Sequence, residues 1–529
     1  MHRTPRAHET MSYREKLFVT GTVAGILILG GFLRFYRIGE KGLWWDEVLT
    51  VRLATVPSFE ETLPLEQLMD PAPQLDIASG LSRHTPDWLL VLRGQTHPPL
   101  SFHLLRDWFR WTSFPVDEAT ARSPFAILGI LNIFLVFILG SRLHSWKLGL
   151  AAAALFAISP FEIYESQEVR GYTLFTLTAL LSYMTFLTLP RQKGGWALFF
   201  YSASLVAAFY THYFAILIVL SQGLILFLPS LRPHFKRWAA GLILAAFFAA
   251  LYLPRLLIVQ FKTPHPLWVW EGPLLPQLLE SLVSLPVKLI LGPDIGFLFY
   301  RLPKPHQILW GLAGGAWFGV WLSGLSHWVK RGQKHIGIFL ILAGWMMVPL
   351  FFLSALDLVR HSVTISLSRY FSFASPAFIL LLIGGFLGLT RTRRWIWVLM
   401  LISVMSLVLA DYYRAPVKQQ DWKGLSRFLQ SESKREDLLV LNQVGRPLWV
   451  APLNTLCLTY YHGTEGHPIY LTGDAFSQMT KEVLQKRKRF WLISQNRFFH
   501  DPGPPLEPIV QREFQGIGSV VLFEARGER

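Results

Sequence analysis

The sequence contains few charged residues, since Asp, Glu, Lys and Arg together make up 16% of its 529 residues. Soluble domains carry about 25% charged residues on average. Hydrophobic residues make up 52% of the chain, and apolar runs long enough to cross a bilayer, about 17 residues or more, recur along most of it. The composition therefore indicates a polytopic membrane protein and excludes an ordinary soluble domain.

The chain has a single cysteine, Cys457. A single cysteine excludes a disulfide within the chain and excludes cysteine-rich zinc or iron–sulfur sites. The first apolar run follows a basic leader without a small-residue cleavage site, so we expect it to be the first membrane helix rather than a signal peptide.

Three motifs that would indicate other functions are missing. The sequence has no GxxxxGK[ST] and no GxGxxG after a strand, so a nucleotide-driven pump has no support. It also has no HExxH, the paired histidine ligands of a membrane zinc protease.

The apolar runs predict about eleven membrane-spanning helices. We expect them near residues 17–33, 122–142, 148–161, 169–189, 196–211, 213–229, 238–254, 307–329, 336–354, 369–389 and 394–410.

The net charge of +16 is explained by where the basic residues lie. Alternate connections collect seventeen of them beside two acids, Glu9 and Glu15, which predicts a cytoplasmic side and a cytoplasmic N-terminus, and disfavours a nucleic-acid partner. The basic residues are Arg3, Arg6, Arg14, Lys16, Arg142, Lys147, Arg191, Lys193, Arg232, Lys236, Arg237, Lys330, Arg331, Lys334, Arg391, Arg393 and Arg394.

The same alternation places three long segments outside: about 34–121, about 255–306 and everything after about 411. We therefore expect a transmembrane domain over 1–411, with 34–121 as its first outer loop, and an external domain over 412–529. In this tail DLLVLN, FWLIS and SVVLFEA read as buried strands, and DWKGLSRFLQ and FSQMTKEVLQK as amphipathic helices. The prediction is a small α/β domain.

The first outer loop contains PLSFHLLRDWFRW, which has amphipathic helical spacing. One face holds Leu100, Leu104, Leu105, Trp108 and Phe109, and the other holds His103, Arg106, Asp107 and Arg110. Such a helix either lies in the membrane interface or packs on the rest of the protein.

The motif LWWDE follows the first predicted span and holds Asp46 and Glu47. Tryptophans anchor a segment at the interface, so both acids would lie near the head groups. There a carboxylate can act as a general base or help to bind a cation. Ordinary solvated acids in an interfacial loop are the alternative.

The motif HPPL opens the amphipathic helix of the first loop. Two prolines fix the backbone, so His97 would have a defined place near the helix start. A histidine there could bind a metal, contact a phosphate or orient an acid. The alternative is a histidine that only begins the helix.

The turn SPFEIYESQEVRGY packs four ionisable residues into a short connection between two spans: Glu162, Glu165, Glu168 and Arg170. Ionisable groups next to hydrocarbon are costly, so they indicate a functional cavity. A structural Glu168–Arg170 pair is the alternative.

Further polar residues lie at the outer ends of other predicted spans: Tyr210, His212, Tyr213, Arg369 and Tyr370. An arginine at this level can bind a lipid phosphate through two hydrogen bonds. Snorkelling of Arg369 to head groups is the alternative.

Together these motifs resemble the GT-C glycosyltransferases, specifically the bacterial branch of the dolichyl-phosphate-mannose–protein mannosyltransferase family, to which the lipid A aminoarabinose transferase is related. The resemblance covers about 30–410. It is carried, in order, by LWWDE, HPPL, ARSPFAILGIL, SPFEIYESQEVRGY, THYFAILIVLSQ and SRYFSFASPAFILLL, with QDWKGLSRFL at the start of the tail.

The resemblance implies a GT-C fold in a bacterial inner membrane and transfer of a sugar from a polyprenyl-phosphate donor to an acceptor on the outer, periplasmic side. It implies that Asp46 is the general base and that Glu47 supports it, with His97 nearby. Residues of the donor site would be Glu168, Arg170, Tyr172, His212, Tyr213 and Arg369. A divalent cation such as Mg²⁺ or Mn²⁺ could assist, although no metal-specific spacing is present.

Two positions depart from the family pattern. Glu165 stands where relatives commonly have an aromatic residue, which affects sugar or metal contacts. Leu100 follows His97-Pro98-Pro99 without the Gly-Lys of the protein mannosyltransferases, so a protein acceptor is not indicated.

Other functions use similar sequences. A flippase or transporter of lipid-linked oligosaccharides would need polar residues at mid-membrane depth and two repeated halves, neither of which is visible here. A polysaccharide polymerase or ligase also uses lipid-linked sugar. A non-catalytic relative would bind glycan through the tail, against which the presence of Asp46, Glu47, His97, Glu168 and Arg369 argues.

Overall fold

The computed structural model describes residues 12–55, 68–69, 98–189, 195–229, 231–250, 273–292, 333–434, 436–442, 457–458, 460–461, 469–472, 489–494, 506–515 and 517–525. Several predictions lie outside these residues: His97, the span over 307–329, the helix FSQMTKEVLQK and the basic residues Arg3, Arg6, Arg191, Lys193, Lys330 and Arg331.

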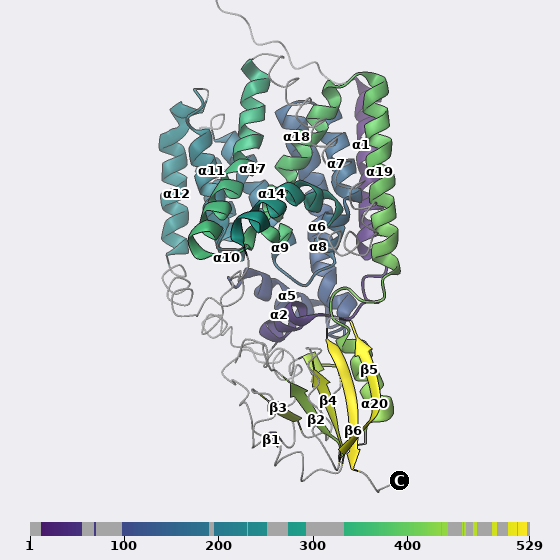
Figure 1. Ribbon diagram of the computed structural model, residues 1–529. Coiled ribbons are helices and arrows are strands. Elements are labelled where there is room, and N and C mark those ends of the chain that lie inside the picture. Colours follow the sequence, from purple (N-terminus) through teal and green to yellow (C-terminus); the bar gives the residue numbers. More distant parts are fainter. Residues whose placement is uncertain are drawn as a thin grey trace, which may run out of the picture. The chain divides into compact units, whose positions relative to one another are not determined.

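The chain forms two compact units (Figure 1). Unit 1 comprises Met1–Tyr36 and Phe125–Tyr412, and unit 2 comprises Arg37–Pro124 and Tyr413–Arg529. One division between the units falls between Tyr412 and Tyr413. The first outer loop, however, groups with the tail and not with the helices of unit 1.

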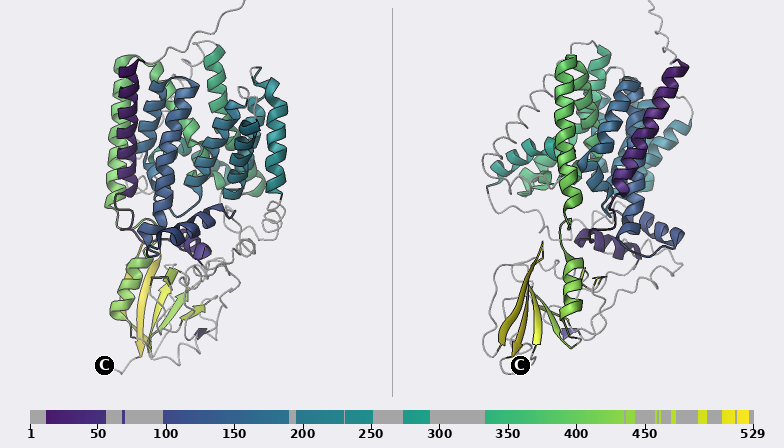
Figure 2. Two further views of the ribbon diagram at one scale, coloured as in Figure 1. Left: turned by 180° about the vertical axis from the view of Figure 1, so that it is seen from behind. Right: turned by 90° about the vertical axis from the view of Figure 1, so that its right-hand side faces the viewer.

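Unit 1 is a bundle of helices (Figure 2). Its helices are α1 (Tyr13–Phe35), α6 (Glu118–Leu143, from residue 125), α7 (Trp146–Ile158), α8 (Pro160–Ser166), α9 (Tyr172–Thr188), α10 (Gly195–Thr211), α11 (Ala215–Ile225), α12 (Phe235–Ala249), α14 (Leu274–Leu291), α17 (Gln333–Arg360), α18 (Ser375–Gly388) and α19 (Arg391–Arg414, to residue 412). Short 3-10 turns are η1 (Arg232–His234), η2 (Thr364–Ser366) and η3 (Ser368–Ala374).

Six stretches among the described residues are long and apolar enough to cross a membrane: α1, α6, α14, His335–Arg360 of α17, Ser368–Gly388 and α19. The pair α7–α8 would be a seventh if its bend of 61° lies within one span. Helices α9, α10 and α11 are apolar but shorter. The membrane-spanning architecture is therefore clear, while the count of eleven is not established.

Helix α14 lies within the segment 255–306, which we expect to be an outer connection. Its residues 274–291 form an apolar helix that runs across the bundle axis (Figures 1 and 2). Leu278, Leu285 and Leu289 are buried against the bundle. An apolar face of this kind is stable because it packs on other helices.

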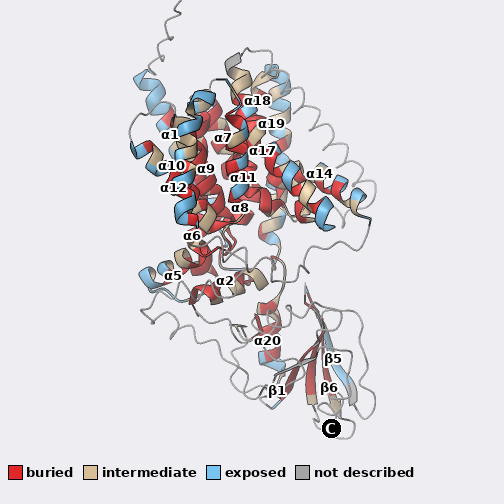
Figure 3. Cartoon of the chain, turned by 90° about the vertical axis from the view of Figure 1, so that its left-hand side faces the viewer, coloured by how far each residue is buried: buried red, intermediate tan, exposed pale blue. Residues whose placement is uncertain are grey.

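Many residues on the outer side of the helices of unit 1 are exposed (Figure 3), and large apolar residues are frequent among them. Ile28 of α1, Phe247 of α12 and Leu407 of α19 are about seven-tenths exposed. An apolar surface of this extent would aggregate in water. It is stable in contact with lipid, which agrees with the membrane location.

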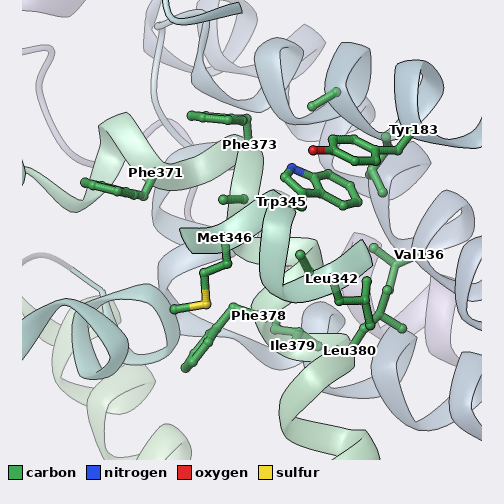
Figure 4. Close-up of a cluster of buried hydrophobic side chains, with 14 of the residues drawn as sticks. Val136, Tyr183, Leu342, Trp345, Met346, Phe371, Phe373, Phe378, Ile379 and Leu380 are labelled. Atoms are coloured by element: carbon green, nitrogen blue, oxygen red, sulfur yellow. The ribbon is translucent and has the colours of Figure 1, made fainter. Parts of the chain in front are cut away.

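The interior of unit 1 is packed around aromatic rings. Tyr183 of α9 stacks on Trp345 of α17 with ring centroids 3.7 Å apart, next to Leu342 and Leu380 (Figure 4). Three buried polar residues there are linked: Gln222 accepts a hydrogen bond from Tyr201 Oη (2.7 Å) and donates one to Ser182 Oγ (3.0 Å). Between helices in lipid, close packing and such hydrogen bonds are the main source of stability.

Several of the basic segments meet at one end of the bundle. The rings of His144 and His335 lie 5.3 Å apart, and Arg237 donates to the Leu189 carbonyl (3.0 Å). Arg394 donates to the carbonyls of residues 386, 387 and 389, where α18 ends. We call this the basic end. That it faces the cytoplasm is a prediction from the positive-inside rule.

Unit 2 combines the first outer loop with the tail. It contains α2 (Trp45–Thr55), α5 (Leu100–Thr112), the start of α6, α20 (Trp422–Glu432) and a sheet. The strands are β1 (Leu68–Met69), β2 (Leu438–Asn442), β3 (Ile469–Thr472), β4 (Arg489–Ser494), β5 (Leu506–Phe514) and β6 (Gly518–Ala525), in the order β1-β3-β2-β4-β6-β5.

The sheet is mixed: β2 pairs in parallel with β3 and β4, while β6 is antiparallel to β4 and β5. Strands β2, β4 and β6 are those that the tail sequence predicts, because their alternate residues form a small apolar core. Strand β1, from the first loop, pairs with β3. Helix α20 is also confirmed, with Asp421 accepting a hydrogen bond from Gly424 N at its N-terminus.

Candidate active site

Asp46 and Glu47 lie in the first turn of α2, in unit 2. Asp46 is half-buried, whereas Glu47 is fully buried. Acids are favourable in a first helical turn because they interact with the free N–H groups and the helix dipole. The pair therefore presents one carboxylate toward the surface and one toward the interior of unit 2.

Glu47 is held by Arg122, which lies near the start of α6. Arg122 Nε contacts Glu47 Oε1 at 2.8 Å, and Nη2 contacts Oε2 at 2.6 Å. Both side chains are almost fully buried. A buried carboxylate in two charge-assisted hydrogen bonds is fixed in one orientation, which suits a residue that supports its neighbour.

Arg122 also organises the loop before α2. Its Nη1 donates to the carbonyls of Ile38 (3.0 Å) and Lys41 (2.8 Å), and Nη2 donates to that of Gly42 (3.1 Å). Arg122 belongs to the motif ARSPFAILGIL, whose pattern alone indicates no role for it. The signal that could have identified it is an arginine next to an apolar span, which needs a partner.

Helix α5 packs on α2 through a face that only partly matches the predicted one, since Phe102 lies outside that face and Leu100 and Leu104 are only partly buried. Phe102 joins Leu49 and Leu53 of α2 in a small core, and Leu105 and Phe109 are also buried. Trp108 Nε1 donates to the Thr120 carbonyl (3.0 Å). This face therefore packs on the protein, which was the second of the two expectations. Near the end of α5, Trp111 and Phe114 are exposed.

In unit 1 the acid turn lies at the end opposite to the basic end, between α7 and α9. Residues 159–170 are all buried, so Glu162, Glu165, Glu168 and Arg170 lie inside the protein rather than in lipid. Helix α8 starts at Pro160, and the Ser159 hydroxyl accepts a hydrogen bond from Glu162 N. Glu162 Oε1 accepts a hydrogen bond from Ser375 Oγ.

The break between α7 and α8 leaves backbone carbonyls of α7 without helical partners, and Arg34 donates hydrogen bonds to them. From the end of α1 its guanidinium donates to the carbonyls of Ala157 (3.0 Å) and Phe156 (3.3 Å) and to Ser166 Oγ (3.1 Å). Arg34 is fully buried. Satisfying freed carbonyls inside a membrane protein is essential for a helix break.

Gln167 connects the acid turn to the ends of two other helices. Its Nε2 donates to the carbonyls of Arg34 (2.9 Å) and Tyr36 (3.0 Å) after α1, and its Oε1 accepts from Tyr412 Oη (2.8 Å) in α19. Glu165 and Glu168 flank Gln167 in sequence. The roles of Arg34 and Gln167 are not visible in the sequence, because nothing in the local pattern indicates their distant partners.

A cluster of rings and cations lies beside this turn. Tyr172 is 5.9 Å from His212 and 6.1 Å from Tyr370, measured between ring centroids. The Arg369 guanidinium lies 5.8 Å from the ring centroids of both Tyr172 and Tyr370. These distances are those of cation–π contacts.

His212 and Tyr213 lie between α10 and α11 and complete this cluster. His212 Nδ1 accepts a hydrogen bond from Phe214 N (3.1 Å), so in the neutral ring Nε2 carries the proton. Arg170, Arg369 and Arg360 all lie within electrostatic range of the Tyr213 hydroxyl. We call Arg170, Tyr172, His212, Tyr213, Arg369 and Tyr370 the cationic–aromatic cluster.

The structure thus brings together five of the predicted donor-site residues, Arg170, Tyr172, His212, Tyr213 and Arg369, with Glu168 in the adjoining turn. Asp46 and Glu47 lie in unit 2, and His97 is outside the described residues. No group of three or more His, Cys, Asp or Glu side chains suited to a metal ion occurs in the part of the chain that is described. The described residues alone do not form a cation site, so binding of a divalent cation stays a prediction.

No protein-family model matches the sequence, and no curated protein matches it. Solved structures do. An oligosaccharyltransferase of Archaeoglobus fulgidus in the apo form has a TM-score of 0.53 at 11% identity, over 91% of this chain and 70% of that chain. The archaeal oligosaccharyltransferase AglB from the same organism, in complex with an inhibitory peptide and a dolichol-phosphate, has a TM-score of 0.52 at 13% identity, with the same coverage.

ArnT from Cupriavidus metallidurans in the apo state covers 96% of this chain and 98% of its own, at 13% identity and a TM-score of 0.46. The two archaeal structures carry the conclusion on the fold, which agrees with the resemblance of the motifs. The chain has the fold of the GT-C glycosyltransferases.

Proposed function

We propose that this protein is a membrane glycosyltransferase that moves a sugar from a polyprenyl-phosphate donor to an acceptor on the outer face of a bacterial inner membrane. The observation that carries the proposal is the cationic–aromatic cluster at the end of the bundle opposite to the basic end. The GT-C fold supports it, as do the two archaeal structures, one of which holds a dolichol-phosphate.

The cluster suits a phosphate that carries a sugar. Arg369 and Arg170 supply positive charge, and a guanidinium can bind two phosphate oxygens with parallel hydrogen bonds. His212 Nε2–H and the Tyr213 hydroxyl add neutral donors. Tyr172 and Tyr370 offer aromatic faces on which a sugar ring can pack. Positive charge near the leaving phosphate lowers the barrier for its departure.

Asp46 is the proposed general base. It takes the proton of the acceptor hydroxyl while the hydroxyl oxygen attacks the anomeric carbon, and the bond from that carbon to the phosphate oxygen breaks. The products are the glycosylated acceptor and the polyprenyl phosphate. Glu47, held by Arg122, keeps the first turn of α2 in place. A single displacement inverts the anomeric centre, which NMR of the product tests directly.

A lipid-linked donor suits the proposed outer location of the site. A nucleotide sugar made in the cytoplasm does not reach an outer active site, whereas a lipid-linked sugar arrives within the bilayer. A divalent cation could assist the phosphate, and a further structure of the A. fulgidus oligosaccharyltransferase is described as a complex with Zn and sulfate. No step of the proposed reaction depends on a metal.

The test is release of polyprenyl phosphate by the purified protein from a panel of radiolabelled polyprenyl-phospho-sugars, with lipid extract as acceptor. We expect release from one donor, and its loss by a factor of about 10² to 10⁴ in Asp46→Asn. Asp117→Asn is the matched control, because Asp117 Oδ1 only accepts the N–H of Thr120 at the start of α6, and Asn accepts it equally well.

Two outcomes would contradict the proposal. Turnover that survives in Asp46→Asn removes Asp46 as the base. No release from any donor, together with movement of the lipid-linked sugar across liposome membranes without acceptor, would make the protein a flippase. Counting the sugars moved per acceptor distinguishes transfer of one sugar from a polymerase or ligase.

A further inference from the structure

The start of α2, which carries Asp46, is held by residues of the tail as well as by Arg122. Trp45 N donates to Gln420 Oε1 (3.3 Å), and the same oxygen accepts Trp422 Nε1 (3.0 Å). Trp422 is fully buried as the first residue of α20. The first N–H groups of a helix lack partners within it, so Gln420 acts as a cap supplied from about 375 residues away.

Tyr461 makes a second contact of this kind. Its hydroxyl accepts Leu43 N (2.5 Å) and donates to Glu118 Oε1 (3.2 Å). Glu118 also contacts Lys423 Nζ at 2.7 Å. A Cβ at Gly42 would lie 3.0 Å from Lys423 Cβ and 3.4 Å from the Tyr461 hydroxyl, so the loop before α2 passes very close to the tail.

Cys457, also in the tail, lies within electrostatic range of Asp46. Its thiol is fully buried, and burial, with a contribution from the nearby Asp46 carboxylate, raises its pKa. Residues 43–46 are therefore approached by Gln420, by Tyr461 and by Cys457, which come from two separate parts of the tail.

We propose that Gln420 and Tyr461 are positioning residues of the transferase, which hold the start of α2 and so fix the place of Asp46. The inference rests on the proposed function and gives the tail a specific part in it. The tail then completes the support of the base, and Gln420 and Tyr461 act through Asp46 without contact with the reacting atoms.

The experiment compares Gln420→Leu and Tyr461→Phe with two controls. Gln420→Glu keeps an oxygen that accepts both N–H groups, so it should restore function. Tyr460→Phe removes a neighbouring hydroxyl that donates to the Val116 carbonyl (3.4 Å), not to the loop before α2. Turnover and affinity for the labelled donor are measured separately for each variant.

We expect kcat to fall between about tenfold and about 10²-fold in Gln420→Leu and Tyr461→Phe, since a misplaced catalytic group costs rate in this range. Donor affinity should change by less than about threefold, whereas a general loss of structure would weaken donor binding as well. The kcat of both controls should stay near that of wild type. Wild-type kcat in both test variants, or an equal loss in Tyr460→Phe, would overturn the proposal.

A second readout does not need activity. Cys457 is the one cysteine of the chain, so its rate of reaction with a maleimide reports on this part of unit 2 alone. The rate should rise severalfold in Gln420→Leu and Tyr461→Phe and stay low in Tyr460→Phe. If wild type turns over no donor, the proposed function fails. Separately, an unchanged maleimide rate in Gln420→Leu and Tyr461→Phe would refute the support of α2 by the tail. If Gln420→Leu does not fold, the same kcat and maleimide measurements on Tyr461→Phe still test the proposal.

Discussion

Glu47 and Arg122, 75 residues apart, form a buried ion pair with two parallel hydrogen bonds of 2.8 and 2.6 Å. The pair fixes the carboxylate next to Asp46, and Arg122 simultaneously holds three carbonyls of the preceding loop. The conformation of the loop before α2 thus depends on one guanidinium at the start of α6.

Breaking this pair should be costly. Arg122→Leu leaves the Glu47 carboxylate buried without its cation, so we expect a loss of about 3–5 kcal/mol in the free energy of unfolding. Thermal unfolding of the purified protein in detergent measures it. Glu40→Gln is the control, because the Arg37–Glu40 pair is partly exposed and such pairs contribute about 0–1 kcal/mol. Equal effects of both changes would contradict the assigned role of Arg122.

Arg369→Lys tests the donor phosphate site. Lysine keeps the charge but lacks the planar fork, so we expect loss of about one charge-assisted hydrogen bond, about 1.5–3 kcal/mol, which weakens donor affinity about 10- to 100-fold. Binding of labelled donor to the purified variant is the measurement. Arg394→Lys, at the basic end, should bind donor like wild type. Unchanged affinity in Arg369→Lys would exclude Arg369 from the phosphate site.

Gly129→Ala tests the close approach of α6 to the acid turn. An added Cβ would lie 2.3 Å from Ser166 Oγ and 2.7 Å from Arg34 Nε, so Arg34 must move and the free energy of unfolding should fall by about 1–3 kcal/mol. Gly21→Ala is the control, since nothing lies within 4 Å of its Cβ. That change should leave the unfolding temperature equal or slightly higher, because alanine favours helix. A tolerated Gly129→Ala would show that this packing is looser than described.

His103 predicts a dependence of stability on pH. Burial lowers its pKa, while Asp107 opposes and Arg106 reinforces this shift. The folded protein then binds fewer protons than the unfolded chain, so the contribution is complete above the unfolded value of 6.5 and is lost as the pH falls through the lower, folded pKa.

We therefore expect the unfolding temperature of wild type to fall more on acidification from about pH 8 to about pH 5 than that of His103→Gln. Asp107→Asn removes the group that raises the pKa of His103, so its acid-induced loss should exceed that of wild type. Identical pH profiles for the three proteins would contradict the burial of His103.

Local patterns predict much of this fold. An apolar run must form a helix in lipid, because only intrahelical hydrogen bonds satisfy its backbone there, and α1, α6, α17 and α19 occupy their predicted runs. Alternation of apolar residues likewise predicts β2, β4 and β6. Helix α14 shows the limit, since an amphipathic apolar segment inside a long connection gives no sign of whether it packs on the bundle.

For the candidate site, too, one part could be predicted from the sequence and another part could not. The sequence by itself determined which residue types can do the chemistry: acids and arginines beside apolar spans are costly, so Asp46, Glu168, Arg170 and Arg369 stand out. Only the tertiary structure decided what holds the segments that carry them. Arg34 donates a hydrogen bond to Ser166, 132 residues away, and Tyr461 accepts one from Leu43 N, 418 residues away. The reason is physical, because periodicity records which face of an element is apolar, whereas a hydrogen bond between distant segments depends on how whole elements pack.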